Sequence, residues 1–181
     1  ADDKQKTYDG QVFSGFTTSI TGFVNGENGT MVSGAASISG SALSATQAGT
    51  HSILVTAGSL AAANYAFSYQ PGSLVIGKAT LTVRADDKQK AYDGQVYSGF
   101  TTSISGFVNG ENVSVLSGAA SISGSATTAI DRGVYPIVAG VGTLAANNYQ
   151  FSILVNGTLE IARTGPSVNG QRTGSFTINQ L

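Results

Sequence analysis

Short stretches of alternating residues, separated by turn residues, run through the chain. Phe16–Phe23 and His51–Ala57 place every second residue on one face, and they predict two strands. Ala35–Ala42 alternates small and polar residues around Ile38 and predicts a weaker strand. A period of two, with few helical signals, indicates a mostly β fold.

A hairpin with an aromatic face is predicted in the second half of this pattern. Its arms are Tyr65, Phe67 and Tyr69 before the turn Gln70–Ser73, and Leu74 and Ile76 after it. Leu60–Ala63 allows one helical turn, and Lys6–Asp9 is a polar lead into an Asp-Gly turn. Asn25–Gly29 is the strongest turn cluster, because Asn and Gly accept positive φ at low cost.

The whole pattern occurs twice. Ala1–Asn28 and Ala85–Asn112 differ at only three of 28 positions, and the offset between them is 84 residues. This offset holds as far as Phe67 and Phe151, after which one extra residue in the second copy makes it 85. A period of this length fits a whole small domain better than a solenoid unit.

The repeat predicts two tandem domains and a tail. We expect a β-rich repeat 1 at residues 1–78, a β-rich repeat 2 at 79–163, and a Gly/Ser/Asn-rich linker or tail at 164–181. Lys78–Arg84, in which Leu81 and Val83 alternate with polar residues, predicts an extended, paired connector that joins the repeats stiffly into an elongated body. If a full unit starts at this connector strand, repeat 1 lacks the strand and has an open edge. That edge either stays open or is filled by the tail of the same chain or of a neighbour.

Composition narrows the functional class. Charged residues make up 10% of the chain and the net charge is −1, so no basic stripe is available to neutralise a phosphate backbone. We therefore expect no nucleic-acid partner. The chain has no Cys, which excludes disulfides and thiolate metal sites, and it has no apolar run long enough to span a bilayer as a helix. It also has no signal peptide, and we expect it to be a fragment of a longer exported protein.

Several spaced motifs resemble a known family. They are Tyr-Asp-Gly at Tyr8–Gly10 and Tyr92–Gly94, Gly-Phe-Val-Asn-Gly-Glu at Gly22–Glu27 and Gly106–Glu111, Gly-Val-Tyr-Pro-Ile at Gly133–Ile137, Asn-Tyr at Asn148–Tyr149 and Val-Asn-Gly-Thr-Leu at Val155–Leu159. Their order is similar to that of the tandem MBG/YDG-type repeats of large bacterial surface proteins, which include filamentous-haemagglutinin-like adhesins. Repeat 1 departs from the pattern at Gly49–Ile53 and at Gln70–Ser73. The resemblance implies an exported, extracellular module of a stalk or passenger region, with neighbouring repeats as partners and no catalytic residues to carry over.

The candidate chemical groups are few. His51 is the only histidine, so no histidine metal cluster exists, and a structural or surface role is expected. The recurring acidic residues are Asp2, Asp3, Asp9 and Glu27 in repeat 1 and Asp86, Asp87, Asp93 and Glu111 in repeat 2. Asp86 and Asp87 lie beside the connector, where calcium is one interpretation. A solvated charged turn is the other and preferred one, because no Asp-x-Asp-x-Asp loop is present. We therefore expect no metal and no cofactor.

Three further features of the sequence bear on function. The aromatic residues Tyr65, Phe67, Tyr69, Tyr149 and Phe151 are either core residues, which is the preferred interpretation, or a sugar-stacking platform. Asn28, Asn112 and Asn156 match the short glycosylation pattern, which occurs often by chance. No Gly-x-Ser-x-Gly elbow accompanies a suitable His and acid, so we expect no enzymatic activity.

Two functions remain after these exclusions. The favoured one is a structural spacer of a secreted or surface-anchored bacterial adhesin, built as two small β-rich domains of either β-grasp-like or immunoglobulin-like form. The alternative is an adhesion module in which the turns Asn25–Asn28 and Asn109–Asn112 bind a host or matrix glycan or protein. The sequence identifies no ligand-binding residue.

Overall fold

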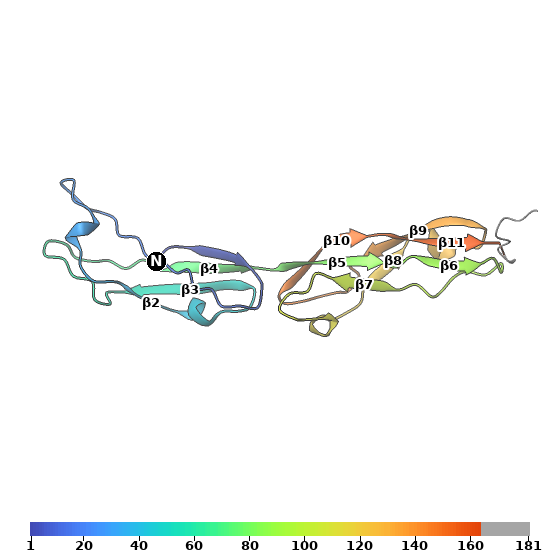
Figure 1. Ribbon diagram of the computed structural model, residues 1–181, viewed down its shortest axis with the longest axis horizontal. Helices are drawn as coiled ribbons and strands as arrows, with labels where there is room; N and C mark the ends of the chain where they lie inside the picture. The colour runs from blue at the N-terminus through green and yellow to red at the C-terminus, as the bar shows by residue number, and fades with distance from the viewer. Residues whose placement is uncertain (164–181) are drawn as a thin grey trace, which may run out of the picture.

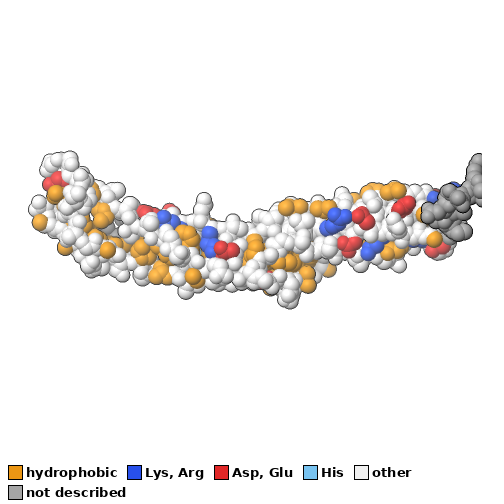
Figure 2. All heavy atoms as spheres, in the orientation of Figure 1, with side chains coloured by type: hydrophobic (Ala, Val, Ile, Leu, Met, Phe, Trp, Pro, Cys, Tyr) orange, Lys and Arg blue, Asp and Glu red, His pale blue; other side chains and the backbone are white. Residues whose placement is uncertain are grey.

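The computed structural model describes residues 1–163. Two β-rich repeats follow each other along one long axis (Figure 1). The face of the molecule shown in Figure 2 is mostly uncharged, with small groups of charged side chains. The prediction of a mostly β chain made of two tandem domains in an elongated arrangement is confirmed. The predicted tail at 164–181 lies outside the described residues.

Repeat 2 is built from two sheets. Its strands are β5 (Ala79–Ala85), β6 (Lys88–Ala91), β7 (Thr102–Ser105), β8 (Ser121–Ser123), β9 (Gly133–Gly140), β10 (Tyr149–Val155) and β11 (Gly157–Ala162). One sheet has the order β10-β5-β7 and the other the order β6-β11-β9-β8. β5 is parallel to β10 and antiparallel to β7, while β11 is parallel to β6 and antiparallel to β9.

The central strand β5 is the most deeply buried strand of repeat 2. Ala79, Leu81, Val83 and Ala85 alternate with polar residues, and all four are buried. This alternation fits a strand with one face on the core. The predicted extended and paired connector is therefore confirmed, since β5 is hydrogen-bonded on both of its sides.

Within the described residues, repeat 1 has only one regular sheet. Its strands are β1 (Lys4–Thr7), β2 (Ser37–Ser39), β3 (Gly49–Thr56) and β4 (Gly72–Gly77), in the order β1-β4-β3-β2. This sheet corresponds to β6-β11-β9-β8 of repeat 2, with the same parallel and antiparallel pairs. The helical pieces of the described residues are short 3-10 turns at Gly29–Met31, Ser41–Ser44, Val113–Val115 and Ser125–Thr128.

The predicted strand at Phe16–Phe23 is wrong for repeat 1. Residues 16–23 of repeat 1 form no strand, although the corresponding segment of repeat 2 contains β7. β7 pairs with β5. Repeat 1 has no counterpart of β5 among the described residues, so its alternating segment has no strand to pair with.

The predicted aromatic hairpin is also wrong. In repeat 2, β10 and β11 follow each other in the chain but do not pair, because β10 belongs to the sheet of β5 and β11 to the sheet of β9. Figure 1 shows them almost in line, so the chain passes at Asn156 from one sheet to the other. In repeat 1, residues 64–71 form no strand, and only β4 is regular.

The smaller differences between predicted and observed elements also depend on which backbone segments pair. The polar lead at Lys6–Asp9 overlaps a strand, β1, because its backbone pairs in parallel with β4 although its side chains are polar. Leu60–Ala63 makes no helical turn, and Ala61 instead forms an isolated bridge with Ser33. The weak strand predicted at Ala35–Ala42 shortens to β2 before a 3-10 turn, whereas the strand predicted at His51–Ala57 is confirmed as β3.

The extra residue of the second copy has a structural counterpart. The pairing of β10 with β5 shifts register between Phe151 and Ile153, which marks a bulge at Ser152. A bulge inserts one residue into a strand without moving the elements on either side. The change of offset from 84 to 85 falls at this place in the sequence.

Candidate functional site at the junction between the repeats

The two repeats are joined by two nearly collinear strands. β4 ends at Gly77 and β5 begins at Ala79, so Lys78 alone separates them. Figure 1 shows both strands along the long axis of the molecule. The amide of Ala79 donates to the carbonyl oxygen of Asn148 at 2.9 Å, and the ammonium group of Lys78 donates to the carbonyl oxygen of Ala146 at 2.9 Å. The chain is therefore held by repeat 2 as soon as it leaves repeat 1.

One apolar core contains residues of both repeats. It comprises Tyr8, Ala42, Ala45, Ile53, Leu74 and Ile76 of repeat 1 together with Ala79, Leu81 and Tyr149 of repeat 2. The half-buried side chains of Phe107, Val108 and Leu116 pack against this cluster from repeat 2. Bending at the junction would expose this surface to water, at a cost of about 25 cal/mol per Å² of apolar area. The junction is thus part of a folded core.

Two tyrosines and one glutamate lie at the centre of the junction. The rings of Tyr8 and Tyr149 meet edge to face with centroids 5.5 Å apart. The hydroxyl group of Tyr8 donates to one carboxylate oxygen of Glu111 at 2.7 Å, and that of Tyr149 donates to the other. Tyr8 and Tyr149 are both buried. Glu111 therefore accepts one hydrogen bond from each repeat.

The protonation of the tyrosines follows from this arrangement. The hydrogen bond to Glu111, together with burial, raises the pKa of Tyr8 to about 12. Burial, and then the hydrogen bond to Glu111, also raises the pKa of Tyr149. A hydroxyl group that donates to a carboxylate loses its proton less readily, because the phenolate would face a like charge. Both tyrosines remain hydrogen-bond donors well above neutral pH.

A polar rim surrounds the aromatic centre. The side chain of Gln11 donates to the side-chain oxygen of Asn109 at 3.1 Å. Asn148 accepts from the amide of Ala48 at 2.9 Å and donates to the side chain of Gln47 at 2.7 Å. These hydrogen bonds are directional, so they fix how one repeat is rotated about the long axis relative to the other.

The loops that meet at the junction contain residues with positive φ that pack closely against each other. Asn109 has a positive φ of 55°, as has Asn25, its counterpart in repeat 1, at 53°. Asparagine tolerates this left-handed conformation better than most residues. Gly10, with φ of 74°, packs so closely against the Asn109 side chain that an added Cβ atom would lie 2.3 Å from its nitrogen. The Asp-Gly and Asn-Gly turns predicted from the sequence therefore meet at the junction.

The outer ends of the molecule carry the same residues without a partner repeat among the described residues. Tyr92, the counterpart of Tyr8, is 40% exposed, whereas Tyr8 is 3% exposed. At the other end, the hydroxyl group of Tyr65 donates to Glu27, and Phe23 meets the Tyr65 ring edge to face at 5.5 Å. These residues repeat the Phe107, Tyr149 and Glu111 arrangement of the junction. We call the surface of Phe23, Asn25, Glu27 and Tyr65 the entry face of repeat 1.

The acidic pairs beside the strands form hydrogen bonds within each repeat. Asp86 accepts from the hydroxyl groups of Thr101 at 2.5 Å and Ser103 at 2.9 Å, and Asp87 accepts from the amide of Thr158 at 2.7 Å. Asp2 and Asp3 make the equivalent contacts in repeat 1. The hydrogen bond from Thr101, then that from Ser103, holds the pKa of Asp86 below its usual value. The preferred interpretation, a solvated charged turn, is incomplete because these carboxylates connect separate segments.

The other acidic residues of the prediction lie elsewhere. Asp9 pairs with Lys6 at 2.5 Å and Asp93 with Lys90 at 2.6 Å, both on the surface. No group of three or more His, Cys, Asp or Glu side chains in the described part of the chain is arranged to hold a metal ion. Sequence reasoning did not single out Tyr8 paired with Glu111. The signal available was the recurrence of Tyr-Asp-Gly and Asn-Gly-Glu in both copies.

The remaining candidate residues have structural contacts. A ring nitrogen of His51 lies 3.0 Å from the carbonyl oxygen of Gln47. Asn28 and Asn112 each cap a 3-10 turn by accepting from the amide two residues later, and Asn156 accepts from the amide of Ala139 at 3.1 Å. Tyr149 is buried in the core, Phe151 is half-buried, and Tyr69 is 40% exposed. Within residues 1–163, no helix is both long and apolar enough to cross a membrane.

These features define a class of protein. The chain is a tandem of small β domains that share a core at their junction and present matching faces at their ends. A family model described as MBG domain (YGX type) matches residues 1–75 and 81–160. The chain therefore belongs to the MBG domain family, as a tandem of two repeats. No curated protein matches it.

Proposed function

We propose that this chain is a rigid spacer segment of a bacterial surface adhesin, which holds an adhesive region away from the cell. The observation that carries the proposal is the apolar core shared by the two repeats, with Tyr8 and Tyr149 at its centre. A spacer needs each joint to resist bending, and a core that continues through the joint provides this resistance. The sparse surface charge suits a crowded extracellular position, and membership of the MBG family supports a place in a surface protein.

The proposal includes no catalytic activity and no cofactor. Its partners are neighbouring repeats of the parent protein, which meet at faces like the one around Glu111. The alternative function is a glycan- or matrix-binding module. It requires the turns Asn25–Asn28 and Asn109–Asn112 to act as equivalent binding loops. Their positions differ, because Asn109 contacts Gln11 and Gly10 inside the junction while Asn25 belongs to the entry face. This asymmetry favours a structural role for the turns.

Small-angle X-ray scattering tests the spacer. The matched control is the same chain with about eight Gly/Ser residues inserted between Gly77 and Lys78, since such residues act as a flexible linker. We expect the unmodified chain to scatter as one stiff rod and the control to scatter as two lobes with variable separation. Equal flexibility of the two chains would contradict the spacer.

A binding screen separates the spacer from the adhesion module. The unmodified chain is tested at micromolar concentration against a panel of glycans and matrix proteins, with and without calcium. The spacer predicts no saturable binding. Saturable binding that is lost when residues 25–27 are replaced by Ser would support the adhesion module instead.

A further inference from the structure

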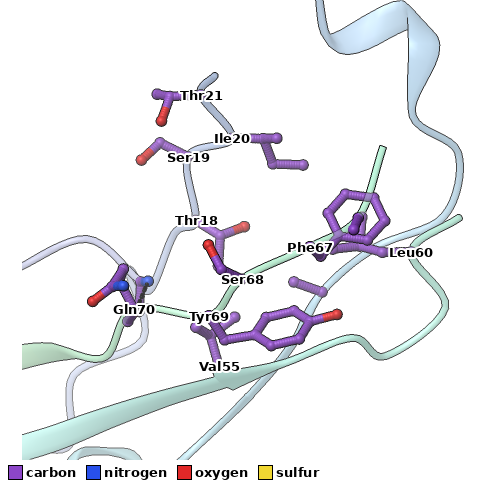
Figure 3. Close-up of a pocket in the computed structure, with 13 residues that line it drawn as sticks. Thr18, Ser19, Ile20, Thr21, Val55, Leu60, Phe67, Ser68, Tyr69 and Gln70 are labelled. Carbon is purple, nitrogen blue, oxygen red and sulfur yellow. Dashed lines mark hydrogen bonds between the residues drawn. The ribbon is translucent and has the colours of Figure 1, made fainter. Parts of the chain in front are cut away.

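Repeat 1 has a groove that is lined mostly by irregular segments. The groove has a volume of about 270 Å³ and lies between residues 18–21 and residues 66–70, with Ala1 at one end. Figure 3 shows the two segments facing each other, with Ile20 on one side and Phe67 and Tyr69 on the other. Both segments are irregular, although their side chains alternate as strands do.

The walls of the groove correspond to the two strands that flank β5. At the offset of 84 residues, 18–21 corresponds to 102–105, which is β7. Residues 66–70 correspond to the part of β10 that ends at Val155, with the bulge at Ser152 as the extra residue. In repeat 2 the strand between these walls is β5, and it contributes four buried side chains. The groove of repeat 1 therefore lies at the position of a central strand.

The first residue of the chain already occupies the end of this position. Ala1 corresponds to Ala85, the last residue of β5. Its ammonium group donates to the carbonyl oxygen of Gln70 at 2.7 Å, on one wall. The amide of Asp2 donates to the carbonyl oxygen of Thr17 at 3.1 Å on the other, as Asp86 does to Thr101 at 3.0 Å. A strand that ran into Ala1 would thus enter the groove in the register of β5.

The entry face gives a second and separate observation. In the junction, Glu111 accepts from Tyr149 of its own repeat and from Tyr8 of the preceding repeat. Glu27 accepts from Tyr65 of its own repeat only, as far as the described residues go. The entry face thus has the groups that dock a preceding repeat of the same kind. The entry face therefore points to a preceding repeat as the source of the strand. In this chain, β5 is the strand with which the chain passes from repeat 1 into repeat 2.

We propose that repeat 1 is a strand acceptor, and that its groove takes the exit strand of a preceding repeat of the same type. The strand has the alternating pattern of Ala79–Ala85 and runs directly into Ala1. Its residue equivalent to Val83 lies between Ile20 and Tyr69, and its residue equivalent to Leu81 lies beside Phe67, as the pairings of β5 with β7 and β10 require. The inference does not depend on the spacer function, because an adhesion module of the same repeats would need the same strand.

The test compares the chain with two extended forms. One form carries Lys-Ala-Thr-Leu-Thr-Val-Arg, copied from Lys78–Arg84, directly before Ala1. The matched control carries the same extension with its Leu and Val replaced by Asp. Amide hydrogen exchange of residues 18–21 and 66–70 and the Tm are measured for all three chains. We expect the first extension to slow exchange in both walls by about 100-fold or more, because paired core strands are protected, and to raise the Tm by about 5 °C or more.

Several results would overturn the proposal. Unchanged exchange in the extended chain would do so, as would equal protection by the Asp-containing control. Walls that are already protected in the unextended chain would indicate another occupant. Loss of that protection on deletion of residues 164–181 would identify the tail, and loss on dilution would identify a second copy of the chain. Either finding would replace the preceding repeat as the source of the strand.

Discussion

Ala1–Asn28 of repeat 1 and Ala85–Asn112 of repeat 2 have almost the same sequence, yet they differ in structure at one place. Residues 102–105 form β7 in repeat 2, and residues 18–21 form no strand in repeat 1. The segments differ only at Thr21 and Ser105, and the β-branched Thr, which favours strands, is in the segment that forms no strand. The difference therefore comes from β5, which lies between β7 and β10 in repeat 2. Strand formation in these segments is decided by a partner and not by local propensity.

The comparison also distinguishes the two halves of repeat 1, which are the half that contacts repeat 2 and the half that does not. The sheet of β1, β4, β3 and β2 is complete in repeat 1 and has the same order as its counterpart in repeat 2. That half of repeat 1 contributes Leu74, Ile76 and Ile53 to the core shared with repeat 2. Regular structure in repeat 1 is therefore strongest where it meets its neighbour. The half without a neighbour in the described residues contains the groove.

The largest expected effect is at the centre of β5. Leu81 is fully buried, and Leu81→Ala removes apolar contacts from the shared core. We expect a loss of about 2–5 kcal/mol in the free energy of unfolding, with β7 and β10 losing their protection from hydrogen exchange. The matched control Leu54→Ala, at a side chain that is 46% exposed on β3, should cost less than about 1 kcal/mol. Urea denaturation measures both variants. An equal loss in the free energy of unfolding for Leu81→Ala and Leu54→Ala would argue against β5 as the central strand.

A smaller effect is expected at the matched isoleucines. Ile104 pairs with Val83 and is half-buried, whereas Ile20 is 39% exposed beside the groove. We expect Ile104→Ala to lower the free energy of unfolding by about 1–2 kcal/mol and Ile20→Ala by less than about 0.5 kcal/mol. Chemical denaturation of both variants measures the difference. A reversed order would mean that Ile20 is buried in solution by an occupant of the groove.

The junction hydroxyl group gives the next comparison. Tyr8→Phe removes one of the two hydrogen bonds to Glu111 and should cost about 1–2 kcal/mol. Tyr92→Phe makes the same chemical change at the exposed counterpart and should have almost no effect. Thermal unfolding of the two variants, followed by circular dichroism, is the measurement. If the two substitutions were equally harmless, the hydrogen bond from Tyr8 to Glu111 would not stabilise the junction.

The smallest expected effect is the loss of thermal stability at acid pH. The hydrogen bonds from Thr101 and Ser103 hold the folded-state pKa of Asp86 below its ordinary value of 3.8. The stability that they contribute is therefore present above that value and is lost as the pH falls through the lower folded-state pKa. We expect the Tm to change little between pH 7 and about pH 5 and to fall below about pH 4.

Two variants test the acid prediction. In Asp86→Asn the fall of the Tm below about pH 4 should be shallower than in the unmodified chain. Ser103→Ala, which removes one of the two hydroxyl groups that donate to Asp86, should also make this fall shallower. An identical profile for all three chains would show that Asp86 has the same pKa in the folded and unfolded states.

Particular residues show which parts of the fold and of the junction could be predicted from the sequence. The period of two identified β3 and β5, and the repeat identified two tandem domains, because burial on one face leaves a local trace in the sequence. β1 and β6 were missed because they are polar strands that pair through their backbones. The aromatic hairpin was wrong because a turn sequence between two alternating segments does not reveal whether they pair with each other or with a distant strand. Tyr8 and Glu111 are 103 residues apart, and no local pattern connects them.

The measurement that tests the central claim most directly is the alignment of the two repeats in solution. Residual dipolar couplings are collected for backbone amides of both repeats in a weakly aligned sample, and an alignment tensor is fitted to each repeat separately. A junction that contains a continuous core and the Tyr8, Tyr149 and Glu111 contacts predicts one tensor, with the same magnitude and orientation for both repeats. Two tensors of different magnitude would show that the repeats move independently, and would contradict the rigid junction.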